Sequence, residues 1–394
     1  MLRPVKLVVF AHTPPPLHGQ SQMVAYLMEG FGGDCRRRPP GAPANPHGIE
    51  LYHVNARLSD DLQDVGSARW GKIGSLLTYC LQAIGARLRH GAKTLYYVPS
   101  PPKRTSLYRD WIVMALCRPF FPRLILHWHS VGLGAWLETV AKPWERWITL
   151  RLLGGATLSL SLSHFNQQDA DKLRPRAHAI VANGILDPCP GKSLRRPPPS
   201  AHGPASEVKE LKVLFLALCT RDKGVHDAAE GVAVANQLAE ARQLPWRFSL
   251  RVAGTFVRSD EERDFDQLRS RPELQGRIER LGFLDAKAKA EALNTADLFC
   301  FPTYYANEGQ PLNLLEAMAY GIPCVTTFWR AIPELFEAGY PGLIEPRSPQ
   351  RVGEALLTLA STASETVLRQ RFLAHYTLDQ HLATLATALK SVEK

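Results

Sequence analysis

Residues 307–325 read NEGQPLNLLEAMAYGIPCV, and this stretch contains the local pattern that decides the fold. Just before it, the apolar run ADLFCFP at 296–302 predicts a buried strand. The letters LNLLEAMAY are strong helix formers, and Pro311 is expected at the first helical position. Gly321 is typical of the residue that ends a helix, and the β-branched run IPCVTT follows it. Strand, loop, helix and strand in this order predict a right-handed crossover in a parallel sheet.

Two glutamates, Glu308 and Glu316, lie on either side of the start of this helix. A helix start suits a phosphate, because free N–H groups and the positive end of the helix dipole point there. A carboxylate accepts well from paired sugar hydroxyls. The pattern indicates a nucleotide-sugar site, with the diphosphate on the helix start, the ribose on Glu316 and further hydroxyls on Glu308. The alternative is that both glutamates are solvated residues at a helix end.

The composition is that of a globular protein with more than one domain. The chain has 394 residues, of which 45% are hydrophobic, and this length exceeds one ordinary core. No apolar run is long enough to cross a bilayer, and no signal peptide opens the chain. The seven cysteines are scattered and none forms C-x-x-C, which indicates neither disulfides nor structural zinc. We therefore expect a cytoplasmic protein.

The net charge of +10 favours a phosphate or an anionic lipid as a partner. Basic residues cluster at 36–38 and 86–93, and residues 142–153 combine two tryptophans with arginines and a leucine-rich face. This last segment is suited to a membrane surface, although we favour a core-facing helix with a charged outer edge. No zinc-finger spacing and no RNA-binding aromatic signature indicates nucleic acid.

Residues 187–207 are rich in proline and serine and have no periodicity, which predicts a linker. Six strand-like runs precede it and five follow, alternating with helical segments, so we expect two α/β halves. The predicted boundaries are 1–186 for a Rossmann-like N-terminal domain and 208–374 for a Rossmann-like C-terminal domain. Residues 375–394 have helical periodicity.

The stretch 307–325 resembles the E-x7-E signature of the family-4 retaining glycosyltransferases (glycosyl transferases group 1). The resemblance implies the GT-B fold, in which two Rossmann-like parallel-sheet domains face each other across a cleft and the last helix crosses back to the first domain. It also implies that a sugar passes with retention from a nucleotide-diphospho-sugar to a sugar or lipid-linked acceptor, in cell-surface polysaccharide or glycolipid synthesis. No metal and no cofactor are expected. The matching residues are Glu308, Gly309, Pro311, Glu316, Ala317, Met318, Ala319, Gly321, Pro323 and Thr326.

The resemblance assigns roles to residues of the second domain. Glu308 is expected to be catalytic, beside the donor sugar, and Glu316 to bind the ribose. Lys223 falls where the family grips the diphosphate, but Leu218 occupies the position of the usual arginine. Arg221 stands within two residues of the lysine instead, which puts the two-cation clamp in doubt. Further candidates for donor binding are Gly309, Gln310, Pro311 and Leu312 in the motif itself, and Arg330.

The resemblance also assigns roles to residues of the first domain. His127 and His129 end a strand and point the same way; the register favours His129 as the catalytic-site histidine that contacts the donor sugar, with His127 sharing or exchanging that role. Buried hydrogen-bonded histidines are the alternative, and a metal pair lacks a third ligand at suitable spacing. Gly19 lies in a proline-rich loop that faces the donor phosphate and precedes a helix near Ser21. Asn183, in VANGI, is expected to line the cleft.

Three other functions remain as alternatives at this stage. The first is a GT-B nucleotide-sugar epimerase, and the second is a phosphorylase, which would need a pyridoxal lysine that the sequence does not indicate. The third is a basic, non-catalytic protein that binds a membrane surface and leaves the two carboxylates idle. A metal-dependent transferase would need a D-x-D motif in a loop, whereas Asp169-Ala170-Asp171 is expected to open a helix.

Overall fold

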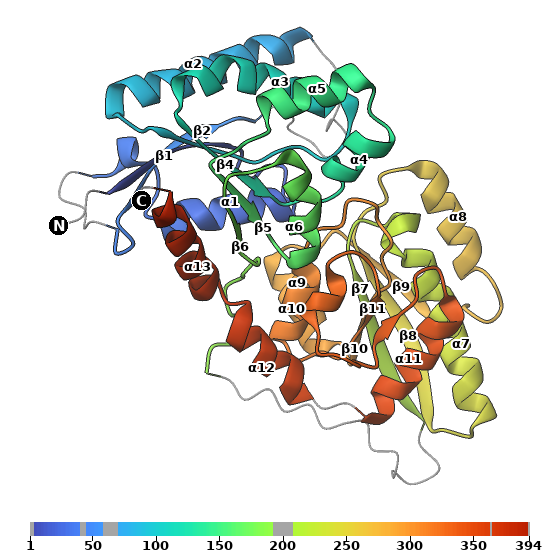
Figure 1. Ribbon diagram of the computed structural model, residues 1–394. Helices are drawn as coiled ribbons and strands as arrows, with labels where there is room; N and C mark the ends of the chain where they lie inside the picture. The colour runs from blue at the N-terminus through green and yellow to red at the C-terminus, as the bar shows by residue number, and fades with distance from the viewer. Residues whose placement is uncertain (1–3, 40–44, 58–69, 192–207, 363–364, 393–394) are drawn as a thin grey trace. The chain divides into compact units, whose positions relative to one another are not determined.

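The computed structural model describes residues 4–39, 45–57, 70–191, 208–362 and 365–392 (Figure 1). The chain divides into two compact units, which we call the first and the second domain. The first domain is Met1–Gly184 with Leu378–Lys394, and the second is Ile185–Thr377. Most of the predicted linker, residues 192–207, lies outside the described residues.

The first domain is built on a six-stranded parallel sheet in the order β2-β1-β3-β4-β5-β6. Its strands are nearly continuous apolar runs because helices cover both faces of the sheet. The strands are β1 (Val5–Ala11), β2 (Ile49–Asn55), β3 (Thr94–Tyr97), β4 (Arg123–Trp128), β5 (Leu158–Ser161) and β6 (His178–Ile180).

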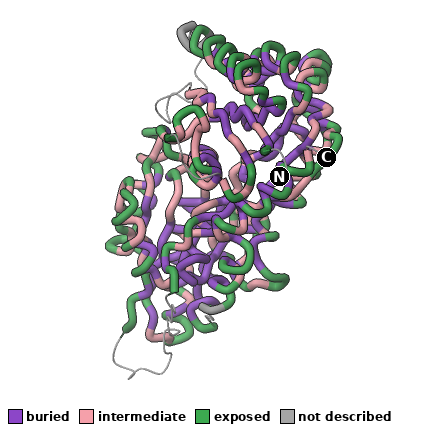
Figure 2. The backbone as a smooth tube through the Cα atoms, turned by 90° about the vertical axis from the view of Figure 1, so that its left-hand side faces the viewer, coloured by how far each residue is buried: buried purple, intermediate pink, exposed green. Residues whose placement is uncertain are grey.

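Two hydrophobic clusters fill the two faces of this sheet. One contains Leu76 of α2 and Met114 of α3, and the other contains Leu27 of α1 and Leu385 of α13. Figure 2 shows the buried backbone in purple inside the exposed helical surfaces. The helices are α1 (Gly19–Gly30), α2 (Trp70–His90), α3 (Arg104–Cys117), α4 (Leu133–Thr139), α5 (Pro143–Leu152), α6 (His164–Ala170) and α13 (Leu378–Ser391), with the 3-10 turns η1 (Cys35–Arg37), η3 (Arg118–Phe120) and η4 (Asp171–Leu173).

The second domain has a second six-stranded parallel sheet in the order β12-β11-β10-β7-β8-β9. Its strands are β7 (Lys209–Leu216), β8 (Trp246–Ala253), β9 (Ile278–Gly282), β10 (Leu298–Phe301), β11 (Cys324–Thr327) and β12 (Leu343–Ile344). Its helices are α7 (Val225–Ala241), α8 (Ser259–Arg269), α9 (Ala286–Thr295), α10 (Leu312–Ala319), α11 (Pro349–Thr362) and α12 (Glu365–His375), with the 3-10 turns η5 (Arg221–Lys223) and η6 (Ile332–Leu335).

All eleven strands predicted from apolar runs are confirmed, and only β12 was missed, because its two residues carry no pattern. The helix predicted near Ser21 begins at Gly19, after His18 as its N-cap. Pro311 precedes the first helical residue, one position earlier than predicted. The Asp169–Asp171 motif closes α6 rather than opening a helix, so that expectation was wrong.

The Asp169 carboxylate has a structural role. It accepts hydrogen bonds from the backbone N–H groups of Gly132, Gly134 and Ala135, at 2.8 to 3.1 Å, and so satisfies the start of α4. The cap therefore accounts for this acidic motif without a metal.

Residues 142–153 were expected to form a core-facing helix with a charged outer edge, and the arginines are indeed exposed, but the buried side of α5 is polar. In α5, Trp144 and Trp147 are 48% and 68% exposed, whereas Glu145 and Thr149 are buried. Glu145 accepts hydrogen bonds from Arg104 at 2.9 Å and Tyr108 at 2.6 Å. The helix turns its polar face inward because this network satisfies the buried carboxylate.

The first residues of the predicted linker are a packed part of the second domain. The Asp187 carboxylate accepts from Arg369 of α12 at 2.6 and 2.8 Å, and Arg369 also donates to the carbonyls of Ala319 and Cys189. The arginine side chain thereby fixes the chain as it enters this domain. Among the described residues, no helix is both long and apolar enough to cross a membrane.

We predict that Leu385→Ala destabilises the first domain by about 2–5 kcal/mol, because Leu385 is fully buried in the cluster beneath the sheet. Thr384→Ala is the matched control on the exposed side of α13 and should change the free energy of unfolding by less than about 0.5 kcal/mol. Urea unfolding measures both. Equal stabilities of the two variants would contradict the packing of α13 on this domain.

Candidate functional site

The residues marked by the sequence in the second domain lie on two loops at the carboxyl edge of its sheet. One loop follows β7 and ends in η5, and the other follows β10 and leads into α10. Because β7 and β10 are neighbours, the two loops meet. Carboxyl ends of parallel strands are the usual place for a ligand in open α/β sheets.

Lys223 and Glu308 form an ion pair at the meeting point of the two loops. Lys223 Nζ lies 2.7 Å from Glu308 Oε2, and the Thr303 hydroxyl donates to the same oxygen at 3.1 Å. The Glu308 residue is 7% exposed, and Lys223 Nζ also lies 4.4 Å from the ring centroid of Tyr305. The ammonium has three N–H groups and gives one to Glu308, so it can still donate to another acceptor.

The backbone around Gly224 sets the position of Lys223. Gly224 has φ of 85°, and a Cβ atom there would lie 2.4 Å from the carbonyl oxygen of Pro302. The N–H of Tyr304 donates to the carbonyl of Asp222 at 2.8 Å, which ties the two loops together. Only glycine allows this close approach of backbone to backbone.

The N-cap residue of α10, Pro311, offers no side-chain cap, and the first turn has no acidic residue, although the N–H of Leu314 donates to Asn313 Oδ1 at 2.8 Å. Gly309, Gln310 and Pro311 before it are buried, and Leu312, its first residue, is half-buried. Because the N–H groups of a first turn have no partner within the helix, this end suits an anionic oxygen.

Glu316 lies further along α10 and is paired with Lys289 of α9. Lys289 Nζ lies 2.5 Å from Glu316 Oε1, and the two side chains are 36% and 22% exposed. Sequence reasoning missed Lys289, since a lysine on an alanine-rich helix carries no sign of its tertiary partner. The Glu316 carboxylate remains partly exposed in this pair and can accept a further hydrogen bond.

Arg221 turns toward α8, where its guanidinium donates to Asp264 at 3.1 Å, and its N–H donates to Glu261. Both Arg221 and Asp264 are more than half exposed, so the structure gives this arginine a surface partner.

The other candidate arginine, Arg330, has φ of 52°, and its guanidinium carbon lies 5.2 Å from the Trp329 ring centroid. Lys223 is therefore the cation that the structure brings to Glu308.

In the first domain, His127 and His129 lie together at the end of β4, with ring centroids 4.2 Å apart. His127 is 1% exposed, and its Nδ1 makes a short hydrogen bond with the Tyr96 hydroxyl. Burial, together with His129 and His381, holds the pKa of His127 well below its usual value. Burial and the nearby His381 and His18 lower the pKa of His129 to about 3, so both rings are neutral at pH 7.

Sequence reasoning missed His381, which α13 brings beside these histidines. Its Nδ1 lies 2.6 Å from the carbonyl oxygen of Ala182, next to the buried Asn183. Gly19 is exposed at the first residue of α1. In the described parts of the chain, no three His, Cys, Asp or Glu side chains gather as metal ligands.

We predict that Gly224→Ala weakens binding of a nucleoside diphosphate, because the new methyl group must push Lys223 and the β10 loop apart. Its matched control is Gly339→Ala, which has φ of 80° but open space around the Cβ position. The control should lose only the roughly 1–2 kcal/mol of a left-handed residue and keep nucleotide affinity. Calorimetry and urea unfolding separate the two effects, and equal nucleotide affinity of both variants would contradict this account of the loop.

Comparison with known proteins finds a family model that matches most of the second domain. Residues 210–362 match the family model of glycosyl transferases group 1. WcaL of Salmonella typhimurium, named as a colanic acid biosynthesis glycosyltransferase, is 32% identical over 142 residues, 35% of this chain and 33% of WcaL. The amylovoran biosynthesis glycosyltransferase AmsK of Erwinia amylovora is 27% identical over 181 residues, 44% of this chain and 42% of AmsK. The matched segments thus span less than half of either relative.

Comparison of structures extends over both domains. The crystal structure of HepE from Anabaena in complex with UDP and glucose superposes with a TM-score of 0.64 at 15% identity, covering 98% of this chain and 99% of HepE. At this identity the likeness is one of fold. The two parallel sheets identify that fold as GT-B, and residues 210–362 are similar to the glycosyl transferases group 1.

Proposed function

We propose that this protein is a retaining glycosyltransferase that moves a hexosyl or related sugar from a nucleoside-diphosphate sugar to an acceptor. The observation that carries the proposal is the Lys223–Glu308 ion pair beside the uncapped start of α10, with Glu316 on the same helix. A lysine, an open helix start and two carboxylates match the diphosphate and the two sets of hydroxyls of such a donor.

Donor binding separates the ion pair in this mechanism. The diphosphate takes the free N–H groups of α10 and the Lys223 ammonium, which leaves Glu308 to face the donor sugar. The ribose hydroxyls donate to Glu316, in place of its contact with Lys289. Lys223 thus exchanges a carboxylate for a phosphate, while the two glutamates exchange a lysine for sugar hydroxyls.

The same groups then stabilise the transition state. As the bond between sugar and phosphate breaks, negative charge grows on the diphosphate beside Lys223 and the helix start. Positive charge grows on the sugar ring, where the Glu308 carboxylate stabilises it more strongly than in the ground state. Because a lysine and backbone N–H groups meet the charge of the leaving group, we propose that no metal ion is required.

The relatives support an acceptor in cell-surface polysaccharide synthesis, since colanic acid and amylovoran appear in their names. A non-catalytic binding protein accounts less well for the site. A half-buried lysine beside a buried carboxylate contributes little net stability, so stability alone gives weak reason for keeping the pair.

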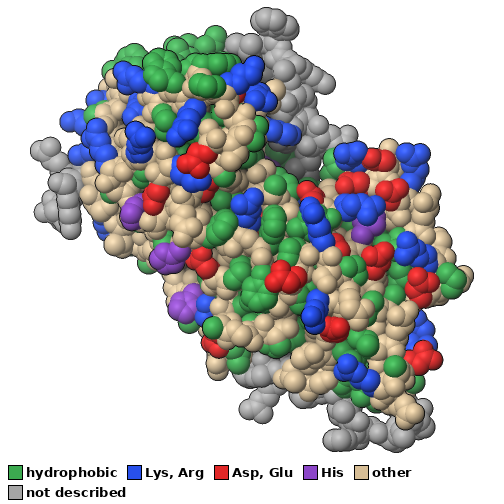
Figure 3. Space-filling view, turned by 45° about the vertical axis from the view of Figure 1, so that its right-hand side comes forward, with side chains coloured by type: hydrophobic (Ala, Val, Ile, Leu, Met, Phe, Trp, Pro, Cys, Tyr) green, Lys and Arg blue, Asp and Glu red, His purple; other side chains and the backbone are tan. Residues whose placement is uncertain are grey.

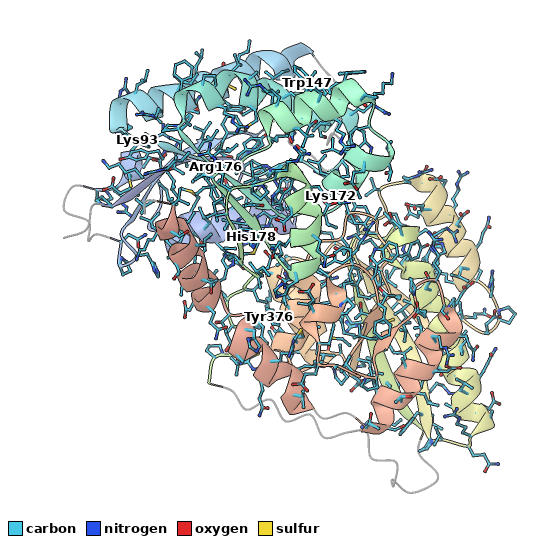
Figure 4. All side chains as sticks on the ribbon, viewed as in Figure 1. Lys93, Trp147, Lys172, Arg176, His178 and Tyr376 are labelled. Carbon is cyan, nitrogen blue, oxygen red and sulfur yellow. The ribbon has the colours of Figure 1, made fainter. Side chains whose placement is uncertain are left out.

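The outer surface of the first domain supports a lipid-linked acceptor. Figure 3 shows hydrophobic side chains gathered at the top of the view among blue lysines and arginines, and Figure 4 labels Trp147 there on α5. Exposed apolar side chains lie on α2, α3, η3 and α5, and one more lies just before α5. We call this set the apolar face. Its members are Leu77, Leu81, Leu88, Ile112, Leu116, Phe120, Val140, Trp144 and Trp147.

The exposed charged residues described on α2, α3, η3 and α5 are all basic. The exposed residues on these helices include Arg89, Arg146 and Arg151, whereas α2 contains no acidic residue. Asp110 of α3 and Glu145 of α5 are both 0% exposed and hydrogen-bonded inside the domain. Exposed tryptophans on helices that present arginines suit the headgroup layer of an anionic membrane. We therefore propose that the protein works at the cytoplasmic face of the membrane.

We predict that the two glutamates fail differently when replaced by alanine. Glu316→Ala should raise the Kd for nucleoside diphosphate by about tenfold or more, since a charge-assisted hydrogen bond contributes about 1.5–3 kcal/mol. Glu308→Ala should lower kcat sharply and leave that Kd unchanged or smaller, because Lys223 is then free for the phosphate. Calorimetry and turnover measure both.

Glu308→Gln is the isosteric control, and it should keep the loop structure while lowering kcat. A panel of UDP- and GDP-sugars, with products identified by mass spectrometry and anomeric configuration by NMR, provides the turnover assay. If Glu308→Ala loses nucleotide affinity while Glu316→Ala binds normally, then Glu308 binds the ribose and Glu316 the donor sugar, the opposite of our assignment. A product of inverted configuration would reject retention.

We predict that the wild-type chain binds vesicles containing anionic lipid at low salt and that the double variant Trp144→Ser, Trp147→Ser does not. The tryptophans would otherwise bury their rings among the headgroups. Phe283→Ser is the matched control, since Phe283 is 70% exposed in the second domain. Vesicle sedimentation measures binding. Equal sedimentation of all three proteins would contradict the proposed membrane contact.

A further inference from the structure

Thr303 is a buried threonine in the loop between β10 and α10, and its backbone is held without its hydroxyl. The Thr303 carbonyl accepts from the hydroxyl of Thr327, at the end of β11, at 2.5 Å. The Thr303 N–H donates to the carbonyl of Phe301, the last residue of β10, at 2.9 Å. Because these contacts use main-chain groups of Thr303, its hydroxyl is left for other partners.

The Thr303 hydroxyl has one proton and two acceptors within reach. Glu308 Oε2 lies 3.1 Å away, and the carbonyl oxygen of Asp222 lies 3.3 Å away. The Asp222 carbonyl already accepts from the N–H of Tyr304 at 2.8 Å, and a carboxylate forms the stronger hydrogen bond. The hydroxyl oxygen itself accepts from the N–H of Tyr305 at 3.2 Å. The proton of Thr303 is therefore donated to Glu308.

The Glu308 carboxylate uses one oxygen for its protein contacts and leaves the other open. Oε2 accepts from Lys223 at 2.7 Å and from Thr303. In the described part of the chain, no group donates a hydrogen bond to Oε1. As long as Oε2 keeps its place, Oε1 is available to a ligand.

A separate set of contacts holds the backbone of Glu308. Its N–H donates to the carbonyl of Tyr305 at 3.1 Å, and the indole N–H of Trp329 donates to the same carbonyl at 2.8 Å. These bonds fix the main chain, whereas the side chain can still rotate about its own bonds. The direction of the carboxylate therefore depends on Lys223 and Thr303.

Donor binding removes one of these two partners in the mechanism proposed above. When the diphosphate takes the Lys223 ammonium, the Thr303 hydroxyl is the partner of Oε2 that remains among the described residues. Glu308 is 7% exposed, and a buried polar group that loses all its partners is costly. Without the hydroxyl, the carboxylate would turn to follow Lys223 toward the phosphate.

We propose that Thr303 is a positioning residue for Glu308, which holds Oε2 after Lys223 has moved to the diphosphate and so directs Oε1 toward the donor sugar. The hydroxyl keeps its own proton throughout. Since Lys223 and Thr303 share one oxygen, the charge partner leaves without turning the carboxylate. The part played by the donor rests on the proposed function, but the contact between Thr303 and Glu308 does not.

The test compares Thr303→Val, which keeps the shape of the side chain and removes the hydroxyl, with Thr303→Ser, which keeps the hydroxyl. Thr303→Val should lower kcat by about tenfold or more, because a hydrogen bond to a charged group is lost. Its Kd for nucleoside diphosphate should stay within about twofold of the wild type, since an interaction that matters at the transition state lowers kcat alone. Thr303→Ser should restore most of the lost kcat. Turnover and calorimetry measure these effects.

Thr149→Val is the matched control for the loss of a buried hydroxyl. Thr149 is 0% exposed, accepts from the indole N–H of Trp111 at 3.0 Å and donates to the carbonyl of Glu145 at 2.7 Å. This variant should lower the urea midpoint of unfolding and leave kcat for a soluble acceptor unchanged. The inference is overturned if Thr303→Val turns over like the wild type, if Thr303→Ser is as slow as Thr303→Val, or if Thr303→Val loses nucleotide affinity as strongly as kcat.

A second measurement needs no turnover and separates this inference from the proposed function. The urea midpoints of wild type, Thr303→Val, Lys223→Met and the double variant form a thermodynamic cycle. Thr303→Val should lower the midpoint more in the Lys223→Met background, because both partners of Glu308 Oε2 are then missing. Additive shifts would overturn the contact even in an active enzyme. Non-additive shifts in a protein without transferase activity would reject the proposed function and retain the contact.

Discussion

The ion pair between Lys223 and Glu308 is the contact around which the second domain arranges its carboxyl edge. The two residues are 85 positions apart, and they meet only because β7 and β10 are adjacent in the sheet. A lysine and a carboxylate taken partly out of water gain little net free energy from each other. Their positions are set instead by uncharged contacts: the close approach of Gly224 to Pro302 and the hydrogen bond from Tyr304 to Asp222. A ligand of the right charge can therefore separate the pair without disturbing the backbone that supports it.

Local sequence predicted those parts of the fold that depend on local patterns. Buried parallel strands are continuous apolar runs, so β7 and β10 could be read directly, and α10 was evident from its helix formers between Pro311 and Gly321. β12 could not be predicted, since two residues show no period. The pairing of Lys289 with Glu316 also escaped, because it joins two helices whose neighbourhood is decided by the sheet order. The motif thus gave the residue types of the candidate site, while tertiary packing gave their partners.

The orientation of α5 illustrates why periodicity alone can mislead. A leucine-rich face suggested inward apolar packing, but Glu145 and Thr149, four positions apart, form the face that is buried. Arg104 and Tyr108 make this possible by donating to the carboxylate, and Trp111 donates to the Thr149 hydroxyl at 3.0 Å. A buried polar network satisfied in this way is as acceptable inside a domain as apolar packing. Sequence shows which residues could pair, but only the neighbouring helix α3 determines that they do.

The buried acids of the first domain also shape its outer electrostatics. Asp110 and Glu145 point inward, so their helices present arginines to solvent without carboxylates beside them. Asp110 accepts from the Tyr97 and Ser100 hydroxyls and also forms an ion pair with Arg109. The histidines nearby behave differently, because burial keeps His129 and His12 neutral at pH 7. Positive charge in this part of the domain therefore comes from guanidinium groups, whose protonation does not change near neutral pH. The tautomer of each neutral imidazole decides which of its ring nitrogens donates a hydrogen bond.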